Sequence, residues 1–356
     1  MYDIKELGPM APPYGGVSVF VKRLIERLSD DGFTVGGYYA EAKPMGQVKS
    51  AMFEKWTWFQ TLYFPWKFFK YAFRLKDYRV LHSHMSLEAM VYLWAFRHIL
   101  RKKIIITIHN SMVEQYYGYT NPINRFFLHR MVRDKDVVWI ACSQEGKEQM
   151  ERLPLHFASP IHVIPAYIPA RASESDLSDS LQSYLRSHEK NLVFYGHSFM
   201  LHRGTDVYGF KAMLTLYSML RKNNPQLGLV YCIAETTDMA SIAQLQSLAG
   251  EDKEAIFWQL GGIANMASLW NQTDVYVRPT STDGDSLSVR EALEAGAQVV
   301  ASDVVKRPSG TIVYRHGILE EAAEKIVSAL SIPRQHPAQD YTYYQAMKNI
   351  YLELLS

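Results

Sequence analysis

Short apolar runs alternate along this chain with stretches in which apolar residues recur at helical spacing. Between residues 17 and 28, apolar side chains at positions 17, 20, 21, 24, 25 and 28 are interleaved with Lys22, Arg23, Glu26 and Arg27, which predicts an amphipathic helix. Apolar runs separated by such helices are typical of parallel sheets. In the first half of the chain, the predicted strands cover residues 2–7, 34–39, 80–82, 104–108, 137–141 and 162–164.

A polar stretch at residues 166–187, which includes Pro169, interrupts this pattern and predicts a linker. A second series of strands follows, at residues 192–195, 229–233, 256–260, 275–277 and 299–301. The chain has 356 residues, of which 48% are hydrophobic, so it is long enough for two cores. We therefore predict an α/β protein with two Rossmann-like parallel-sheet domains that face a cleft, where ligands bind beyond the carboxyl ends of the strands.

Charge and cysteine content narrow the classes of function. The 38 basic and 36 acidic residues give a net charge of +2, which predicts no general attraction to nucleic acid. Cys142 and Cys232 lie far apart and lack the spacing of a disulfide framework or a zinc site, which fits a reducing cytoplasm. The acidic N-terminal segment does not resemble a signal peptide, and no window holds about 18 uncharged apolar residues. Secretion and membrane spanning are not expected.

The segment from Arg278 to Gly296 contains the most informative group of polar residues. This segment follows a predicted strand, and its sequence indicates a glycine-containing loop and then a helix. The first backbone N–H groups of such a helix suit a diphosphate. Asp283 and Glu291 are separated by seven residues, so one carboxylate lies on the loop and the other on the helix. Alternatively, Glu291 is the last residue of a capping box that begins at Ser288, or Asp283 helps to bind a divalent metal.

Residues 283–296, followed by Val-Val-Ala-Ser-Asp at 299–303, resemble the Glu-x7-Glu signature of family 4 retaining glycosyltransferases, which have the GT-B fold. Asp283 stands in the first acidic position and Glu291 in the second. The resemblance implies that Asp283 lies near the donor sugar and that Glu291 binds the ribose. It places backbone amides on the diphosphate. The donor-binding residues implied in this loop are Gly284, Asp285, Ser286 and Leu287.

Two further segments are similar to the same family. Gly15-Gly16, after the first strand, resembles the glycine loop that closes over the donor phosphates, although by itself this pair also suits a tight turn. His84 and His109 stand at strand ends and match the histidine positions of the family. The resemblance places His109 near the reacting sugar. His84 is either donor-binding or a buried histidine with its partners satisfied.

The second phosphate-binding segment of the family has the pattern Gly-Arg, a short loop, then Lys-Gly. Here the segment is Gly196-His197 followed by Arg203-Gly204. Arg203 can bind phosphate with two donors, whereas a neutral His197 would give up a positive charge. The resemblance also implies that the C-terminal helix, rather than lying on the surface alone, returns to the N-terminal domain. The expected domains are therefore residues 1–170, 171–339 and, for that helix, 340–356.

Residues 53–76 combine aromatic and basic side chains in a way that suits the headgroup region of an anionic membrane. The alternative is an ordinary helix buried against the first sheet. The aromatic residues are Phe53, Trp56, Trp58, Phe59, Tyr63, Phe64, Trp66, Phe68, Phe69, Tyr71 and Phe73. Further basic residues follow in the same domain at Arg97, Arg101, Lys102 and Lys103.

These observations lead to one functional hypothesis. The chain is expected to be a metal-independent, cofactor-free retaining hexosyltransferase that moves a sugar from a nucleotide-diphosphate sugar to a lipid-linked saccharide. It would act as a peripheral protein on the inner face of the cytoplasmic membrane, in cell-surface polysaccharide synthesis. Two alternatives stay open: another nucleotide-sugar enzyme of the same fold, such as an epimerase or hydrolase, and an inactive membrane-associated scaffold.

Overall fold

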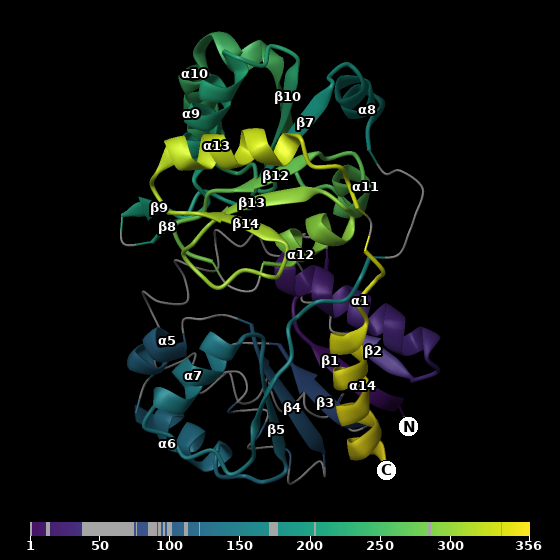
Figure 1. The fold of residues 1–356 in the computed structure, drawn as a ribbon. Helices are drawn as coiled ribbons and strands as arrows, with labels where there is room; N and C mark the ends of the chain where they lie inside the picture. The colour runs from purple at the N-terminus through teal and green to yellow at the C-terminus, as the bar shows by residue number, and fades with distance from the viewer. Residues whose placement is uncertain are drawn as a thin grey trace. The chain divides into compact units, whose positions relative to one another are not determined.

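The computed structural model describes residues 2–11, 15–37, 75, 77–84, 91, 94, 97, 102–109, 113–120, 122–170, 177–202, 204–283, 286–335 and 337–356. The chain forms two compact units, Met1–Ile168 with Tyr341–Ser356, and Pro169–Asp340. Each unit is built on a six-stranded parallel sheet with helices on both faces (Figure 1). The predicted α/β architecture of two Rossmann-like domains is confirmed.

The sheet of the first unit has the strand order β2-β1-β3-β4-β5-β6. Its central strands are almost continuously apolar, as the sequence Lys-Ile-Ile-Ile-Thr-Ile of β4 shows, because both faces of the sheet are covered. The strands are β1 (Tyr2–Leu7), β2 (Val35–Gly37), β3 (Tyr78–Ser83), β4 (Lys103–Ile108), β5 (Val137–Ala141) and β6 (Ile161–Val163). The helices are α1 (Gly16–Asp30), α5 (Val113–Tyr119), α6 (Pro122–Met131), α7 (Gln144–Arg152) and α14 (Thr342–Leu355).

The C-terminal helix α14 completes one face of this first sheet. Its Met347 and Tyr351 are buried in the same apolar cluster as Leu24 of α1 and Ile4 of β1. Polar contacts fix its start: Asp31 accepts hydrogen bonds from the Tyr344 hydroxyl at 2.6 Å and pairs with Lys348 Nζ at 2.7 Å. The last helix of the chain is therefore part of the first core.

The second unit has the strand order β11-β10-β7-β12-β13-β14, which is the 3-2-1-4-5-6 order of a Rossmann fold when its strands are counted along the chain. The strands are β7 (Lys190–Gly196), β10 (Leu227–Ile233), β11 (Ile256–Leu260), β12 (Val275–Arg278), β13 (Gln298–Ser302) and β14 (Thr311–Tyr314), with a short antiparallel pair β8 (Leu201–His202) and β9 (Thr205–Asp206). The helices are α8 (Asp179–Arg186), α9 (Phe210–Arg221), α10 (Met239–Leu248), α11 (Met266–Trp270), α12 (Leu287–Glu294) and α13 (Leu319–Leu330), with a 3-10 helix at Gly250–Ala255.

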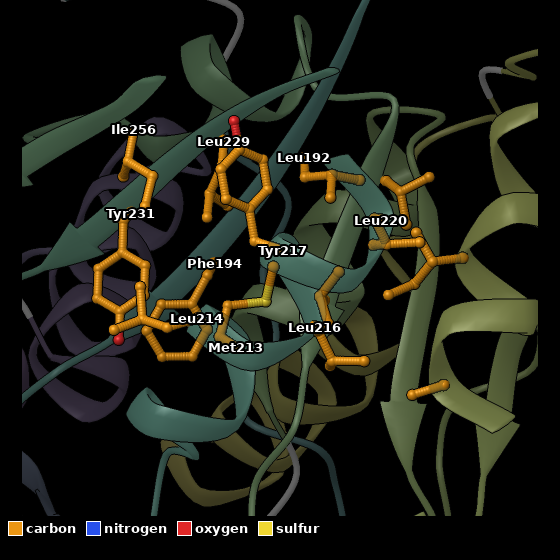
Figure 2. Packing of buried hydrophobic residues seen from close by; sticks show 14 of the residues in the cluster. Leu192, Phe194, Met213, Leu214, Leu216, Tyr217, Leu220, Leu229, Tyr231 and Ile256 are labelled. Atoms are coloured by element: carbon orange, nitrogen blue, oxygen red, sulfur yellow. The ribbon is translucent and has the colours of Figure 1, made fainter. Parts of the chain in front are cut away.

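A dense core lies between α9 and the second sheet. Figure 2 shows side chains of α9, among them Met213 and Tyr217, beside Leu192 and Phe194 of β7 and Tyr231 of β10. The Tyr231 hydroxyl is satisfied because it donates a hydrogen bond to the Phe210 carbonyl at 2.7 Å. This packing fixes the strands whose carboxyl ends bear the candidate residues of the unit.

Gly209, at the start of α9, is a position where only glycine fits. Its φ is +76°, and an added Cβ would lie 2.2 Å from the Pro279 carbonyl oxygen. Gly209→Ala should therefore lower the free energy of unfolding by roughly 2–5 kcal/mol, since left-handed backbone strain and overpacking both oppose it. Gly317→Ala is the matched control in a urea titration, because Gly317 has a φ of +84° but a Cβ there would meet no described atom within 4 Å. Equal losses in the two variants would contradict the steric explanation.

Candidate functional site

A buried carboxylate, Glu6, lies at the carboxyl end of β1 in the first unit. The parallel register pairs Glu6 with His82 of β3, so both side chains lie on the same face of the sheet, near the carboxyl ends of these strands. Glu6 Oε2 lies 2.9 Å from His84 Nε2 and 3.1 Å from His82 Nδ1, and Glu6 Oε1 accepts from the Tyr351 hydroxyl at 2.7 Å. The sequence singled out His84 but not Glu6 or Tyr351, since their meeting depends on strand register and on α14.

The two histidines of the predicted site are brought together. His84 Nδ1 lies 2.8 Å from His109 Nε2, and His109 Nδ1 lies 3.5 Å from the Cys142 sulfur. The Phe20 ring packs edge-on against both imidazoles, with centroid distances of 5.8 and 5.6 Å. His84 is buried and His109 half-buried, so His109 is the member of the pair that a ligand can reach.

Burial and hydrogen bonding set the charges in this cluster. Burial would raise the pKa of Glu6, but His82 and His84 oppose this and lower the pKa to about 2. Burial lowers the pKa of His84 to about 4, and burial together with His84 holds the pKa of His109 well below its usual value. At neutral pH, Glu6 is therefore ionised while His84 and His109 are uncharged.

Among the described residues, Glu6, His82 and His84 form the one group with the spacing of metal ligands, with their ligand atoms within 4.8 Å of one another. These atoms already bond one another. The imidazole nitrogens that face the Glu6 carboxylate are its hydrogen-bond donors, so they have no lone pair to offer a cation. The arrangement is that of a hydrogen-bond network.

The start of α1 follows the predicted glycine loop. Gly15 is the N-cap residue; its N–H donates to Ser18 Oγ at 2.9 Å, and the Ser18 hydroxyl donates to the Gly15 carbonyl at 3.0 Å. A Cβ on Gly16 would meet no described atom within 4 Å. The amides of Gly16 and Val17 come from the first turn of a helix and suit an anion.

In the second unit, the Asp283 carboxylate lies between two buried arginine side chains and pairs with both. Arg278 donates to its two carboxylate oxygens at 3.0 Å each, and Arg307 Nη1 donates to Oδ2 at 2.6 Å. Burial alone would raise the pKa of Asp283, but the two guanidinium groups hold it below its usual value. Both oxygens are thus engaged with arginine, and two cations share one anion at this loop.

Neither arginine was singled out from the sequence. Arg278 ends the buried strand β12, five positions before Asp283, and an arginine at the end of a buried strand was a usable signal. Arg307 lies 24 positions after Asp283 and gave none. It also donates to the Ser302 carbonyl at 2.9 Å and to Thr280 Oγ1 at 3.0 Å, which joins the ends of β12 and β13.

Glu291 does not belong to a capping box, so that alternative is wrong. The helix α12 begins at Leu287 with Ser286 as N-cap, and the Ser288 hydroxyl bonds Tyr276 and Ser286 instead of a helix amide. Glu291 is a buried helical residue whose Oε2 accepts from the Trp270 indole N–H at 3.1 Å. The helix start therefore presents the backbone amides of its first turn.

Of the remaining predicted residues, the structure describes His197 but not Arg203, Gly284 or Asp285. His197 follows β7, is half-buried, and its carbonyl accepts from the Glu235 amide at 2.7 Å. The predictions for Arg203, Gly284 and Asp285 lie outside the described residues, as does the aromatic-basic segment 53–76 apart from Leu75. His197 and Arg203 remain predictions as phosphate ligands.

Two of the basic residues assigned to the membrane-facing region are corrected. The Arg97 side chain is 7% exposed and ion-paired with Asp134, and the buried Lys102 donates through Nζ to the Tyr78 carbonyl. Each cation is satisfied inside the first unit and is not available to a membrane. None of the helices that the structure describes combines the length and apolar character needed to cross a membrane.

Two Rossmann-like parallel-sheet units in one chain, with the last helix returned to the first unit, are the GT-B architecture. Residues 14–170 match the model of Glycosyltransferase Family 4. This match over the first unit supports the resemblance to family 4, and the fold of the chain is that of GT-B glycosyltransferases.

Solved structures agree with this assignment of the fold. The chain is similar over 100% of its length to sucrose-phosphate synthase from Thermosynechococcus elongatus, with 14% identity, 94% of that chain covered and a TM-score of 0.63. Anabaena HepE, in a complex with UDP and glucose, gives 14% identity, 100% and 97% coverage, and a TM-score of 0.62. The trehalose-6-phosphate synthase OtsA gives 12% identity, 99% and 96% coverage, and a TM-score of 0.60. No curated protein gives a significant match by sequence.

Proposed function

We propose that this chain is a glycosyltransferase that transfers a hexose, with retention and without a metal ion, from a nucleotide-diphosphate sugar to a saccharide acceptor. One observation supports this most directly: the start of α12 presents the backbone amides of its first turn between Asp283, with its two arginines, and the buried Glu291. Helix N-termini stabilise diphosphates, and an excess of buried positive charge adds to this. The fold is shared with HepE, which has been solved with UDP-glucose.

In the reaction, the bond between the sugar C1 and the β-phosphate oxygen breaks as a new bond forms from C1 to the acceptor hydroxyl oxygen. The hydroxyl proton passes to the departing phosphate oxygen, so the products are a glycoside and a nucleoside diphosphate. Negative charge grows on that phosphate, and in this proposal the amides of Leu287 and Ser288 stabilise it. Glu291 binds the ribose in this proposal, and His109 of the first unit binds the sugar.

A donor screen tests the proposal. We expect one or a few nucleotide-diphosphate sugars to bind with a Kd in the micromolar range, and the anomeric configuration of the donor to be preserved in a product analysed by NMR. Inverted product would refute retention. Rapid donor consumption without acceptor, giving a defined product, would favour a hydrolase or epimerase, and an absence of nucleotide binding would favour a scaffold.

Removal of metal tests whether the reaction needs a divalent cation. Because Asp283 is already neutralised by two guanidinium groups, it does not need a divalent cation, and treatment with EDTA should leave kcat/KM within about twofold of the untreated enzyme. An assay with added manganese is the matching control. Activity that is abolished by the chelator and restored by manganese would overturn the proposal that the reaction is metal-independent.

The proposed acceptor is a lipid-linked oligosaccharide in cell-surface polysaccharide synthesis, reached from the inner face of the cytoplasmic membrane. Support comes from the aromatic and basic composition of residues 53–76. Flotation with anionic and zwitterionic vesicles tests it: the chain should float with anionic vesicles only, and a Lys67→Glu, Lys70→Glu variant should not. Equal recovery with both vesicle types, or none with either, would contradict membrane contact.

A further inference from the structure

A continuous series of hydrogen bonds connects the interior of the first unit to His109. It runs from the Tyr351 hydroxyl to Glu6, from Glu6 to His84 Nε2, and from His84 Nδ1 to His109 Nε2, with separations of 2.7, 2.9 and 2.8 Å. Every member comes from a different element: α14, β1, and the ends of β3 and β4. Beyond it, His109 Nδ1 faces the Cys142 sulfur at 3.5 Å.

The ionised carboxylate fixes the direction of this series. Glu6 can only accept, so His84 Nε2 must bear the proton of that imidazole. The Nδ1 of an uncharged His84 is then an acceptor, and the proton between the two rings belongs to His109 Nε2. His109 therefore has its lone pair on Nδ1, the ring nitrogen that faces the Cys142 sulfur and not His84.

We propose that Glu6 is a positioning residue which, through His84, holds His109 as the Nε2-protonated tautomer, so that His109 accepts a hydrogen bond from a saccharide hydroxyl. This rests on the proposed function, since it assigns the chemistry by which His109 recognises the sugar. A hydroxyl has the proton that such a lone pair requires, whereas a phosphate or carboxylate oxygen would meet it with a second lone pair. The Cys142 thiol, a weak donor, is the group that a hydroxyl would replace.

The surroundings of Glu6 support a positioning role over a structural one. Glu6 is the acceptor for Tyr351, His82 and His84, so its charge is compensated by hydrogen bonds without an arginine or lysine among the described contacts. Gly8 lies directly against His84, because a Cβ there would be 2.9 Å from the His84 Cβ. The carboxylate and the close backbone together hold the His84 ring in one orientation.

The tautomers can be measured without substrate by two-dimensional NMR of chain labelled with ¹⁵N-histidine, since protonated and unprotonated ring nitrogens have distinct shifts. In the wild type at pH 7, we expect both His84 and His109 to be protonated on Nε2, with His84→Gln and His109→Gln variants used to assign their signals. A wild-type His109 protonated on Nδ1 would overturn the proposal. Because this measurement needs no turnover, its failure is distinct from a failure to find glycosyl transfer.

The Glu6→Gln variant tests the link to activity. The glutamine amide can donate to His84 Nε2, which would reverse the series and leave Nδ1–H on His109, so we expect a changed tautomer signal and kcat/KM lower by roughly 10- to 100-fold. Tyr351→Phe, which keeps the charge on Glu6, should preserve the tautomers. Glu26→Gln, at an exposed position of α1, is the matched control and should change neither quantity. Unchanged tautomers together with unchanged kcat/KM in Glu6→Gln would refute the role of Glu6.

Discussion

Replacing Asp283 by alanine should lower the free energy of unfolding by about 3–5 kcal/mol, because two buried guanidinium groups would lose their shared anion. The Arg278 and Arg307 side chains are only 9% and 2% exposed, so water cannot replace the carboxylate. Urea denaturation followed by tryptophan fluorescence measures the loss, since Trp258 and Trp270 lie in the same unit. Glu321→Ala, which removes the partner of the exposed Arg315, is the control and should have a much smaller effect.

A second variant separates the charge effect from a packing effect at this loop. If the cost of Asp283→Ala arises from unpaired guanidinium groups, adding Arg307→Met should restore part of the lost stability, because one buried cation is removed. The stability of the wild type should also fall more steeply in acid than the stability of the variants that lack Asp283. Its Asp283 has a pKa below the unfolded value of 3.8, so the stability it provides is complete above about pH 4 and is lost as the pH falls through the lower, folded pKa. Additive losses in the double variant would contradict this explanation.

Replacing Glu291 by alanine is expected to weaken binding of the donor by roughly 10- to 100-fold, which corresponds to the loss of a charged hydrogen bond to the ribose. The nucleoside diphosphate and the complete nucleotide sugar share that ribose, so calorimetric titration should show the same fold-loss for both ligands. A loss confined to the nucleotide sugar would instead place Glu291 at the sugar.

The Glu291→Gln variant controls for stability. Glutamine keeps an oxygen that can accept from the Trp270 indole, whereas alanine leaves this buried N–H without its acceptor. We therefore expect Glu291→Gln to unfold near the wild-type urea concentration and still to bind the donor more weakly. Donor binding that is normal in Glu291→Gln would show that shape and not charge is what the ligand requires.

Local patterns predicted the strands well where the strand is five or more residues long. The bounds of β1, β5 and β11 agree with the predicted residues 2–7, 137–141 and 256–260. The strand β14 was missed because it has only four residues, of which Val313 is exposed, so its apolar run is short. A short strand of this kind gives a weak signal even though it belongs to the same sheet as β11.

The site was predictable only as far as its residues act locally. The pairing of His84 with His109 followed from both standing at strand ends, as the sequence indicated. The roles of Glu6 and Arg307 did not, because each depends on which strands are neighbours in the sheet. For the same reason, Arg97 and Lys102 were grouped with surface cations. The sequence does not reveal that Arg97 pairs with Asp134, or that Lys102 donates to the Tyr78 carbonyl, inside the fold.

The placement of α14 affects how this protein can fold during synthesis. The first unit is interrupted by the whole of Pro169–Asp340, and the side chains that close one face of its sheet arrive with Tyr341–Ser356. A nascent chain ending at Ile168 would leave Leu24, Val80 and their neighbours exposed to water. The second unit, in contrast, is contiguous and can fold as soon as it has left the ribosome. The domain that is translated first is therefore expected to be the last to reach its native state.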